Sequence, residues 1–127
     1  MTEYYFDTYA LLQLVNKAPS YANFSNCTII TSTFTLLEFY YCLLRDGHEN
    51  FADVYFDKLL LNSEEVPPDV IKLGARFRIQ INKELPRSKK PLSHIDALTY
   101  VFAKTRKVKF LTGDASFEGL ENVEYVK

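Results

Sequence analysis

Hydrophobic residues along the chain fall into short β-prone runs separated by longer stretches in which apolar positions recur every three or four residues. A short apolar run rich in β-branched and aromatic residues is typical of a buried strand. The pattern predicts four strands, at residues 3–6, 27–31, 108–112 and 123–126. The first of them runs directly into Asp7-Thr8, where a helical pattern begins.

The intervening stretches have the periodicity of amphipathic helices. They predict helices over residues 8–17, 34–46, 49–61, 68–85 and 93–105, with a short helical turn at 21–24. Local signals agree with these bounds. Ser32 or Thr33 suits a helix cap, Gly47 suits a helix end, and Pro68 suits a first helical turn.

Strands that alternate with helices predict right-handed crossovers and a mostly parallel sheet with helices on both faces. We therefore expect an α/β fold, a three-layer α/β/α sandwich around a central sheet of four to five strands. The length of 127 residues fits one domain, spanning residues 1–127, with one core.

Composition adds little beyond this. No apolar run approaches the ~20 residues that span a bilayer, and no secretory signal is visible in the first residues of the sequence. Cys27 and Cys42 lie in apolar surroundings, which predicts reduced, buried thiols in a cytoplasmic protein. There is no Cys/His cluster with zinc spacing.

Charge is unevenly distributed along the chain, although the net charge is only −1. Residues 72–109 hold eleven basic side chains and two acids, whereas the segments on either side are acidic. Such a segment indicates either a surface that faces a polyanion or a solvated helix face rich in Lys and Arg. The sequence alone leaves both open.

Four acids fall at related places in the predicted fold: Asp7, Glu38, Asp96 and Asp114. Asp7 and Asp114 follow the carboxyl ends of strands, Asp96 lies in the first turn of a helix, and Glu38 interrupts an apolar helix. Singly, each has an ordinary explanation as a helix cap, a solvent-exposed residue, a capping-box acid or a turn residue. Jointly, they converge on one edge of a parallel sheet, where ligands bind in α/β proteins.

Four carboxylates at one edge repel one another, at roughly 2–3 kcal/mol for a pair ~6 Å apart in an effective dielectric of ~20. Cations or protons must balance them. Oxygen ligands without Cys or His partners favour Mg²⁺, or Mn²⁺ in its place, over zinc.

These residues resemble the PIN-domain nucleases. That family has an acid and a Ser/Thr after the first strand, a helical Glu, an Asp early in a late helix, and a Thr-x-Asp turn after the next strand. The matching segments are Phe6-Asp7-Thr8, Leu36-Leu37-Glu38, Ser93-His94-Ile95-Asp96 and Thr112-Gly113-Asp114. The resemblance covers nearly the whole chain and is strongest to small stand-alone prokaryotic members, many of them toxins of the VapC type. Some members carry a further acid two residues after the last Asp, where this chain has Ser116, with Glu118 beyond it.

The resemblance implies a PIN-like fold and a metal-dependent endoribonuclease, in which a Mg²⁺-activated water hydrolyses RNA. Asp7, Asp96 and Asp114 would then be metal ligands, directly or through water, and Glu38 a ligand through water or a residue that positions the nucleophile. Thr112 and Thr8 would place hydroxyls near the site. Six basic residues would flank it and contact phosphates: Arg76, Arg78, Lys83, Arg87, Lys89 and Lys90.

Aromatic residues are abundant in the two helices expected at 34–46 and 49–61. They are more numerous than one small core face needs, so part of this surface is interpreted as a homodimer face or a groove for an antitoxin helix. Alternatively, the two helices bury these rings against each other.

Other functions are compatible with the same residues. One is an rRNA- or tRNA-processing PIN nuclease without an antitoxin; another is a non-catalytic RNA-binding or scaffold module. Receiver and phosphatase folds also carry an Asp after the first strand, but the chain lacks the Asp-x-Asp and the paired upstream acids that those functions need.

Overall fold

The sheet is the centre of the molecule. A computed structural model, which describes residues 1–127, contains four strands. They are β1 (Glu3–Phe6), β2 (Thr28–Ile30), β3 (Lys109–Thr112) and β4 (Val123–Tyr125). All pairings are parallel, in the order β2-β1-β3-β4, so the predicted parallel sheet is confirmed. β1 and β3 are the two inner strands. Asp7 directly follows β1, and Thr112 is the last residue of β3.

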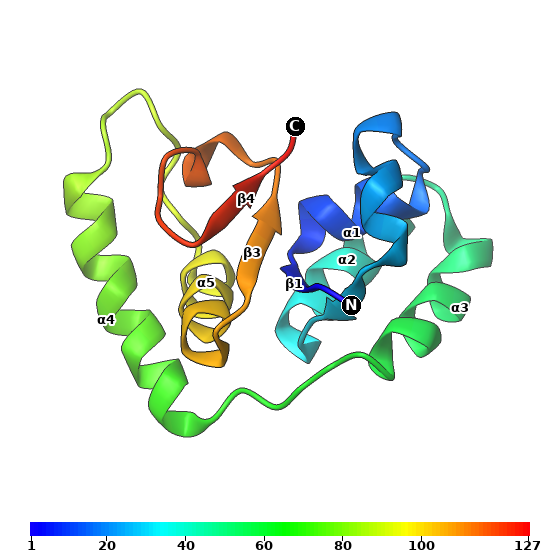
Figure 1. Ribbon diagram of the computed structural model, residues 1–127, viewed down its shortest axis with the longest axis horizontal. Coiled ribbons are helices and arrows are strands. Elements are labelled where there is room, and N and C mark those ends of the chain that lie inside the picture. The colour runs from blue at the N-terminus through cyan, green and yellow to red at the C-terminus, as the bar shows by residue number, and fades with distance from the viewer.

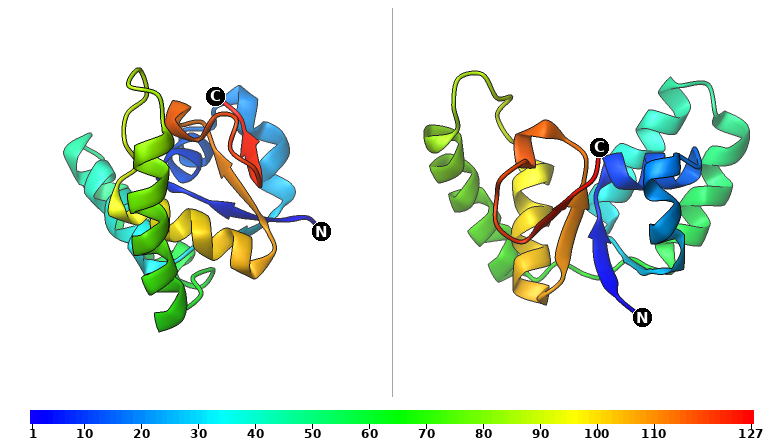
Figure 2. Two further views of the ribbon diagram at one scale, coloured as in Figure 1. Left: turned by 90° about the vertical axis from the view of Figure 1, so that its left-hand side faces the viewer. Right: turned by 45° about the horizontal axis from the view of Figure 1, so that its top comes forward.

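Helices cover both faces of this sheet (Figures 1 and 2). The helical elements are α1 (Thr8–Val15), η1 (Pro19–Asn26), α2 (Thr33–Arg45), α3 (Glu49–Leu60), α4 (Pro68–Glu84), α5 (His94–Arg106) and η2 (Ala115–Phe117). The right-hand view of Figure 2 shows α4 and α5 on one side of the strands and α1 to α3 on the other. The three-layer α/β/α sandwich expected from the sequence is therefore confirmed.

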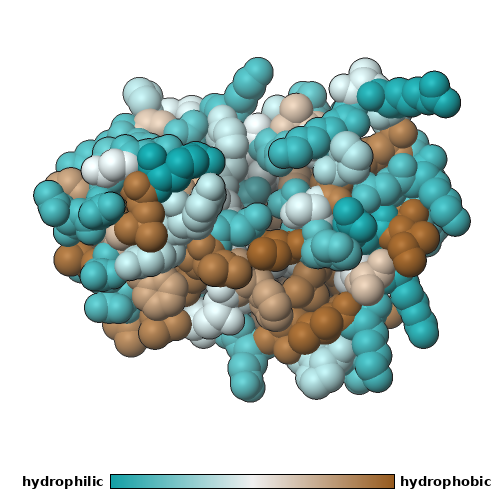
Figure 3. All heavy atoms as spheres, turned by 180° about the vertical axis from the view of Figure 1, so that it is seen from behind, coloured by the Kyte–Doolittle hydropathy of each residue, from teal (hydrophilic) through white to brown (hydrophobic).

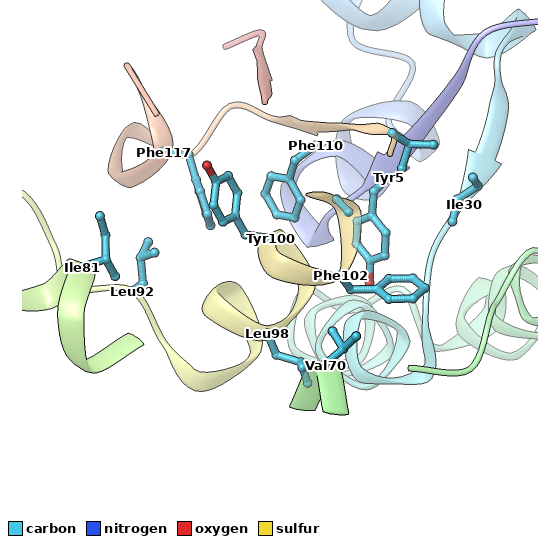
Figure 4. Close-up of a cluster of buried hydrophobic side chains, with 12 residues drawn as sticks. Tyr5, Ile30, Val70, Ile81, Leu92, Leu98, Tyr100, Phe102, Phe110 and Phe117 are labelled. Atoms are coloured by element: carbon cyan, nitrogen blue, oxygen red, sulfur yellow. The ribbon is translucent and has the colours of Figure 1, made fainter. Parts of the chain in front are cut away.

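Alternation along the inner strands divides the core into two clusters, one on each face of the sheet. Tyr5 and Phe110 belong to the cluster with α4 and α5, shown in Figure 4, and Phe6 and Leu111 to the cluster with α1 to α3. The rings of Tyr5 and Phe110 stack with centroids 5.7 Å apart. Both strands are buried on both faces, which fixes their ends, and the acids beyond them, in a rigid frame.

Several local features differ from the sequence predictions. The first helix ends at Val15 rather than at residue 17, where Lys17 has a left-handed φ of 56°. The turn predicted at 21–24 is a longer 3₁₀ helix, η1. Ser32 takes the N-cap position of α2, but its hydroxyl bonds the buried Tyr5 hydroxyl at 2.8 Å instead of a backbone N–H.

The predicted burial of the cysteines was wrong in degree, because Cys27 and Cys42 are free and only half-buried. The aromatic surface has a mixed outcome. Tyr40 packs edge-on against Phe56 between α2 and α3, with ring centroids 5.5 Å apart, whereas Tyr41 and Phe51 remain exposed. The two helices thus bury part of their aromatic side chains against each other and leave part of them at the surface.

Exposed hydrophobic side chains are not confined to Tyr41 and Phe51. Figure 3, which views the molecule from behind, shows hydrophobic residues gathered in the lower middle of that face. Large apolar side chains that remain exposed include Leu37, Leu44, Val54, Leu61 and Ile79, from α2, α3, α4 and the segment after α3. No helix has the length and apolar character needed to cross a bilayer.

Candidate active site

The register of the two inner strands brings the first two site residues together. Phe6 pairs with Leu111, so Asp7 and Thr112 are the next residues along two adjacent parallel strands. The Asp7 backbone N–H donates to the Leu111 carbonyl at 3.4 Å, which extends the ladder by one residue. Both are buried, Asp7 with 6% of its surface exposed and Thr112 with none.

Asp7 has two roles at this point. Its Oδ1 accepts a hydrogen bond from the Ala10 N–H at 2.9 Å, so it caps α1 as its simplest interpretation predicted. Burial nevertheless raises the pKa of Asp7 to about 7; hydrogen bonds from Thr112 and Ala10 oppose the rise, and the charges of Asp96 and Asp114 add to it. A cap alone would not require a buried acid beside two others, so the cap does not account for this environment.

The turn after β3 places Asp114. Thr112 Oγ1 accepts from the Asp114 N–H at 3.0 Å, and Asp114 Oδ1 accepts from the Ser116 N–H at 2.9 Å, which makes Asp114 the N-cap of η2. Gly113 lies between them, where the backbone passes close to the ring of Tyr9 and the carbonyl of Val126. One oxygen of the Asp114 carboxylate is thus committed to the turn.

Asp96 enters from the first turn of α5. It forms a complete capping box with Ser93: Ser93 Oγ accepts from the Asp96 N–H at 3.0 Å, and Asp96 Oδ2 accepts from the Ser93 N–H at 3.2 Å. Burial raises the pKa of Asp96, and the charge of Asp114 raises it further. The capping role is confirmed, and it holds the carboxylate at the edge of the sheet.

Glu38 reaches the site from the second turn of α2. Its Oε1 accepts a hydrogen bond from Thr8 Oγ1 at 3.1 Å. Burial raises the pKa of Glu38, and the charge of Asp96 adds to the effect. Thr8, whose hydroxyl the sequence analysis expected near the site, therefore orients a carboxylate.

The four predicted acids line one cleft of about 280 Å³. Its walls are formed by Asp7, Thr8, Tyr9, Leu12, Glu38, Lys90, Ser93, Asp96 and Asp114. The structure thus brings together the acids that the sequence had placed on one sheet edge, with Thr112 buried beside Asp7 in the register of the adjacent strand. His94, one residue after the helix cap Ser93, is exposed and does not line the cleft.

The donor set of the cleft suits a hydrated divalent cation. No three His, Cys, Asp or Glu side chains stand close enough together to hold a metal ion directly. All the acids, however, offer oxygen, and burial disfavours the charge on three of them. Because Mg²⁺ keeps several water ligands and uses only one or two carboxylates directly, a hydrated Mg²⁺ or Mn²⁺ fits this cleft.

Most of the basic residues expected to flank the cleft do not line it. Arg78 donates to the Leu92 carbonyl at 3.1 Å and Lys89 to the Glu118 carbonyl at 2.7 Å, so both have structural contacts. Only Lys90 lines the cleft. The sequence pattern had grouped Lys90 with five other basic residues. That pattern did not indicate Tyr9 and Leu12, which belong to the part of the cleft wall that α1 contributes.

The family model described as the PIN domain matches residues 4–122, and the chain belongs to that family. The match covers all four acids. No curated protein matches.

Solved structures of similar fold include toxins of bacterial toxin–antitoxin pairs. VapC20 of Mycobacterium tuberculosis, a sarcin-ricin-loop-cleaving toxin, superposes with a TM-score of 0.76 at 17% identity over 97% of this chain and 98% of its own. VapBC2 of Rickettsia felis, bound to a DNA fragment from its promoter, gives 0.72 at 20% identity over 99% and 100%. A toxin–antitoxin complex of Klebsiella pneumoniae gives 0.65 at 18% identity over 95% of both chains.

Proposed function

We propose that the protein is a Mg²⁺-dependent endoribonuclease and the toxin of a toxin–antitoxin pair. The observation that carries the proposal is the cleft in which Asp7, Glu38, Asp96 and Asp114 converge from four separate elements. Burial disfavours the ionised form of these carboxyl groups, and a bound cation would offset that cost. Mn²⁺ would serve in place of Mg²⁺, since both accept oxygen ligands.

The bound cation would lower the pKa of a water molecule and stabilise the charge that develops on the phosphate. The residues of the chain supply the rest. Asp7, Asp96 and Asp114 would hold the cation, directly or through its water ligands. Glu38, oriented by Thr8, would position the attacking water or accept its proton.

Thr112 has a supporting role in this arrangement. Its hydroxyl lowers the pKa of Asp7 by hydrogen bonding and accepts from the Asp114 N–H. It therefore links two of the acids and favours the ionised form of Asp7 that a cation requires. We place it among the active-site residues as a positioning residue.

The toxin assignment draws on the neighbours of similar fold, two of which are toxin–antitoxin complexes. An antitoxin partner would also cover exposed apolar residues of α2 and α3, among them Leu37, Tyr41 and Phe51. A homodimer would use the same kind of surface. A processing nuclease without an antitoxin would share the chemistry but would have no such partner.

The test is cleavage of single-stranded RNA by the purified chain. We expect cutting with Mg²⁺ or Mn²⁺ and none in EDTA. Asp96→Asn and Glu38→Gln should each slow single-turnover cleavage by about 10²-fold or more, because each removes a charge that holds the cation or the water.

Asp57→Asn is the matched control, since Asp57 is an exposed acid on α3 with no side-chain partner. Its cleavage rate should equal that of the wild type. Cutting by Asp96→Asn and Glu38→Gln at the wild-type rate would remove the four-carboxylate site from the proposal.

A further inference from the structure

Lys90 is the only basic side chain in a cleft lined by four acids. Its charge lowers the pKa of both Glu38 and Asp96, against the effect of their burial. The side chain itself is exposed, so its ammonium group is hydrated and able to exchange one anionic partner for another. The cleft therefore already contains a cation that belongs to the chain.

The backbone around Lys90 is fixed in place. Its carbonyl accepts a hydrogen bond from Ser116 Oγ at 3.0 Å, and Ser116 is buried, with 4% of its surface exposed. On the other side, the Leu92 N–H donates to Asn82 Oδ1 at 2.9 Å, and Asn82 Nδ2 returns a hydrogen bond to the Leu92 carbonyl at 3.2 Å. The loop between α4 and α5 is thus attached both to α4 and to η2.

Ser116 connects this loop to the acids. Its N–H holds Asp114 Oδ1 at 2.9 Å while its hydroxyl holds the Lys90 carbonyl. An acid at this position would have added a second carboxylate to the turn, beside that of Asp114; a serine instead adds a donor that fixes the loop carrying a positive charge. The departure at position 116 and the presence of Lys90 in the cleft are therefore two parts of one arrangement.

We infer that Lys90 supplies the second cation of the active site: it lines the cleft together with Glu38 and Asp96 in the free protein and binds the scissile phosphate once a single divalent ion and RNA are present. This inference rests on the proposed function. A lysine acts as a compact point charge on a flexible stem, which suits a group that must move from carboxylate to phosphate. Stabilising charge on a phosphate oxygen is what a second metal ion would otherwise do.

Lys90→Gln distinguishes this role from a structural one, because it is expected to move two measurements in opposite directions. Binding of Mn²⁺ alone, measured by calorimetry, should tighten by about fivefold, since a positive charge that competes for the carboxylates is removed. Single-turnover RNA cleavage at saturating Mn²⁺ should slow by at least about tenfold, since the phosphate loses a charged partner. The wild type should bind one Mn²⁺ per chain.

Two variants serve as controls. Lys90→Arg keeps the charge, and its Mn²⁺ affinity should remain near that of the wild type. Lys89→Gln removes the neighbouring charge of the same loop, whose Nζ contacts the Glu118 carbonyl rather than the acids, and it should alter neither measurement by more than about twofold.

The inference is overturned if Lys90→Gln leaves Mn²⁺ affinity or cleavage unchanged, or if the wild type binds two Mn²⁺ ions. Asp96→Asn in the same cleavage assay keeps the two proposals apart. If the wild type cuts and Asp96→Asn does not, the proposed function holds whatever Lys90→Gln does. If the wild type does not cut RNA, the proposed function fails, and with it the phosphate-binding role of Lys90.

Discussion

Asp7→Asn is expected to abolish RNA cleavage and, in the absence of metal, to make the protein more stable. The loss of activity should reach about 10²–10³-fold, because the proposed cation site would lose the charge of a buried acid. The gain in stability has a separate cause. Asparagine caps helices about as well as aspartate, so Oδ1 of Asn can still accept from the Ala10 N–H, while the cost of a buried anion disappears.

The pH dependence follows from the direction of the pKa shift. The folded protein holds the proton of Asp7 up to a pKa of about 7, whereas the unfolded chain releases it near the ordinary value of 3.8. Between these values the folded state binds more protons, so wild-type stability declines as pH rises from about 4 to about 7 and stays lower above that range. Asp7→Asn lacks this decline.

Melting temperatures in EDTA check this expectation. At pH 8 the variant should melt at least about 4 °C above the wild type, equivalent to at least about 1 kcal/mol, and the two should converge near pH 4. Adding Mg²⁺ should stabilise the wild type more than the variant. Asp57→Asn should match the wild type throughout. A variant that melts below the wild type at pH 8 would show that the charge of Asp7 stabilises the metal-free fold, contrary to this account.

The sequence predicted the elements and the convergence of the acids well, for identifiable physical reasons. The strands and helices have strong periodicity, and parallel strands place their carboxyl ends on one edge. Asp7 and Asp114 could therefore be assigned to the same site without coordinates. Their local roles as caps were equally visible, because caps follow from residue type and position along the chain.

What the sequence could not predict depends on contacts between distant segments. Lys90 stood among six similar basic residues, and only the hydrogen bonds of its loop to Ser116 and Asn82 select it. Ser32 had the residue type of a cap, yet the hydroxyl of a buried tyrosine on β1 competes for it. The 3₁₀ helix over Pro19–Asn26 lacks apolar periodicity, so no pattern marked its full length.

The basic segment illustrates the same limit. Its charge excess is real, but Arg106 pairs with Glu64 at 2.8 Å near the opposite end of α5, and Lys104 pairs with Glu121. These two residues agree with the interpretation as a solvated surface, and the interpretation as a polyanion-facing surface stays a prediction. Some of these residues form ordinary surface ion pairs, while Lys90 faces the cleft.

Gly113→Ala is expected to damage both the fold and the active site. A Cβ at position 113 would overlap the ring of Tyr9 and the backbone carbonyl of Val126. The ring can rotate, but Val126 is held by its N–H to the Thr112 carbonyl at 2.8 Å and by its carbonyl to the Tyr21 hydroxyl at 2.6 Å. Relief of the overlap must therefore break these bonds or move the turn that carries Asp114.

We expect a loss of about 2–3 kcal/mol in the free energy of unfolding, from overpacking and weakened hydrogen bonds, measured by urea denaturation. Single-turnover cleavage, measured well below the melting temperature, should also fall by at least about tenfold, because a small displacement of Asp114 would misplace a proposed metal ligand.

Gly47→Ala separates these effects from the general cost of replacing a glycine. Gly47 ends α2 with a φ of 82°, and no other atom lies within 4 Å of the position that a Cβ would take there. Alanine there should cost only about 1 kcal/mol through backbone strain and should leave cleavage unchanged. If Gly113→Ala behaves like Gly47→Ala, the turn after β3 has room to adjust, and the close approach of Val126 does not constrain Asp114. If only Gly113→Ala loses activity, the segment after β4 helps to define the proposed metal site, because Val126 holds the Thr112 end of the turn that carries Asp114.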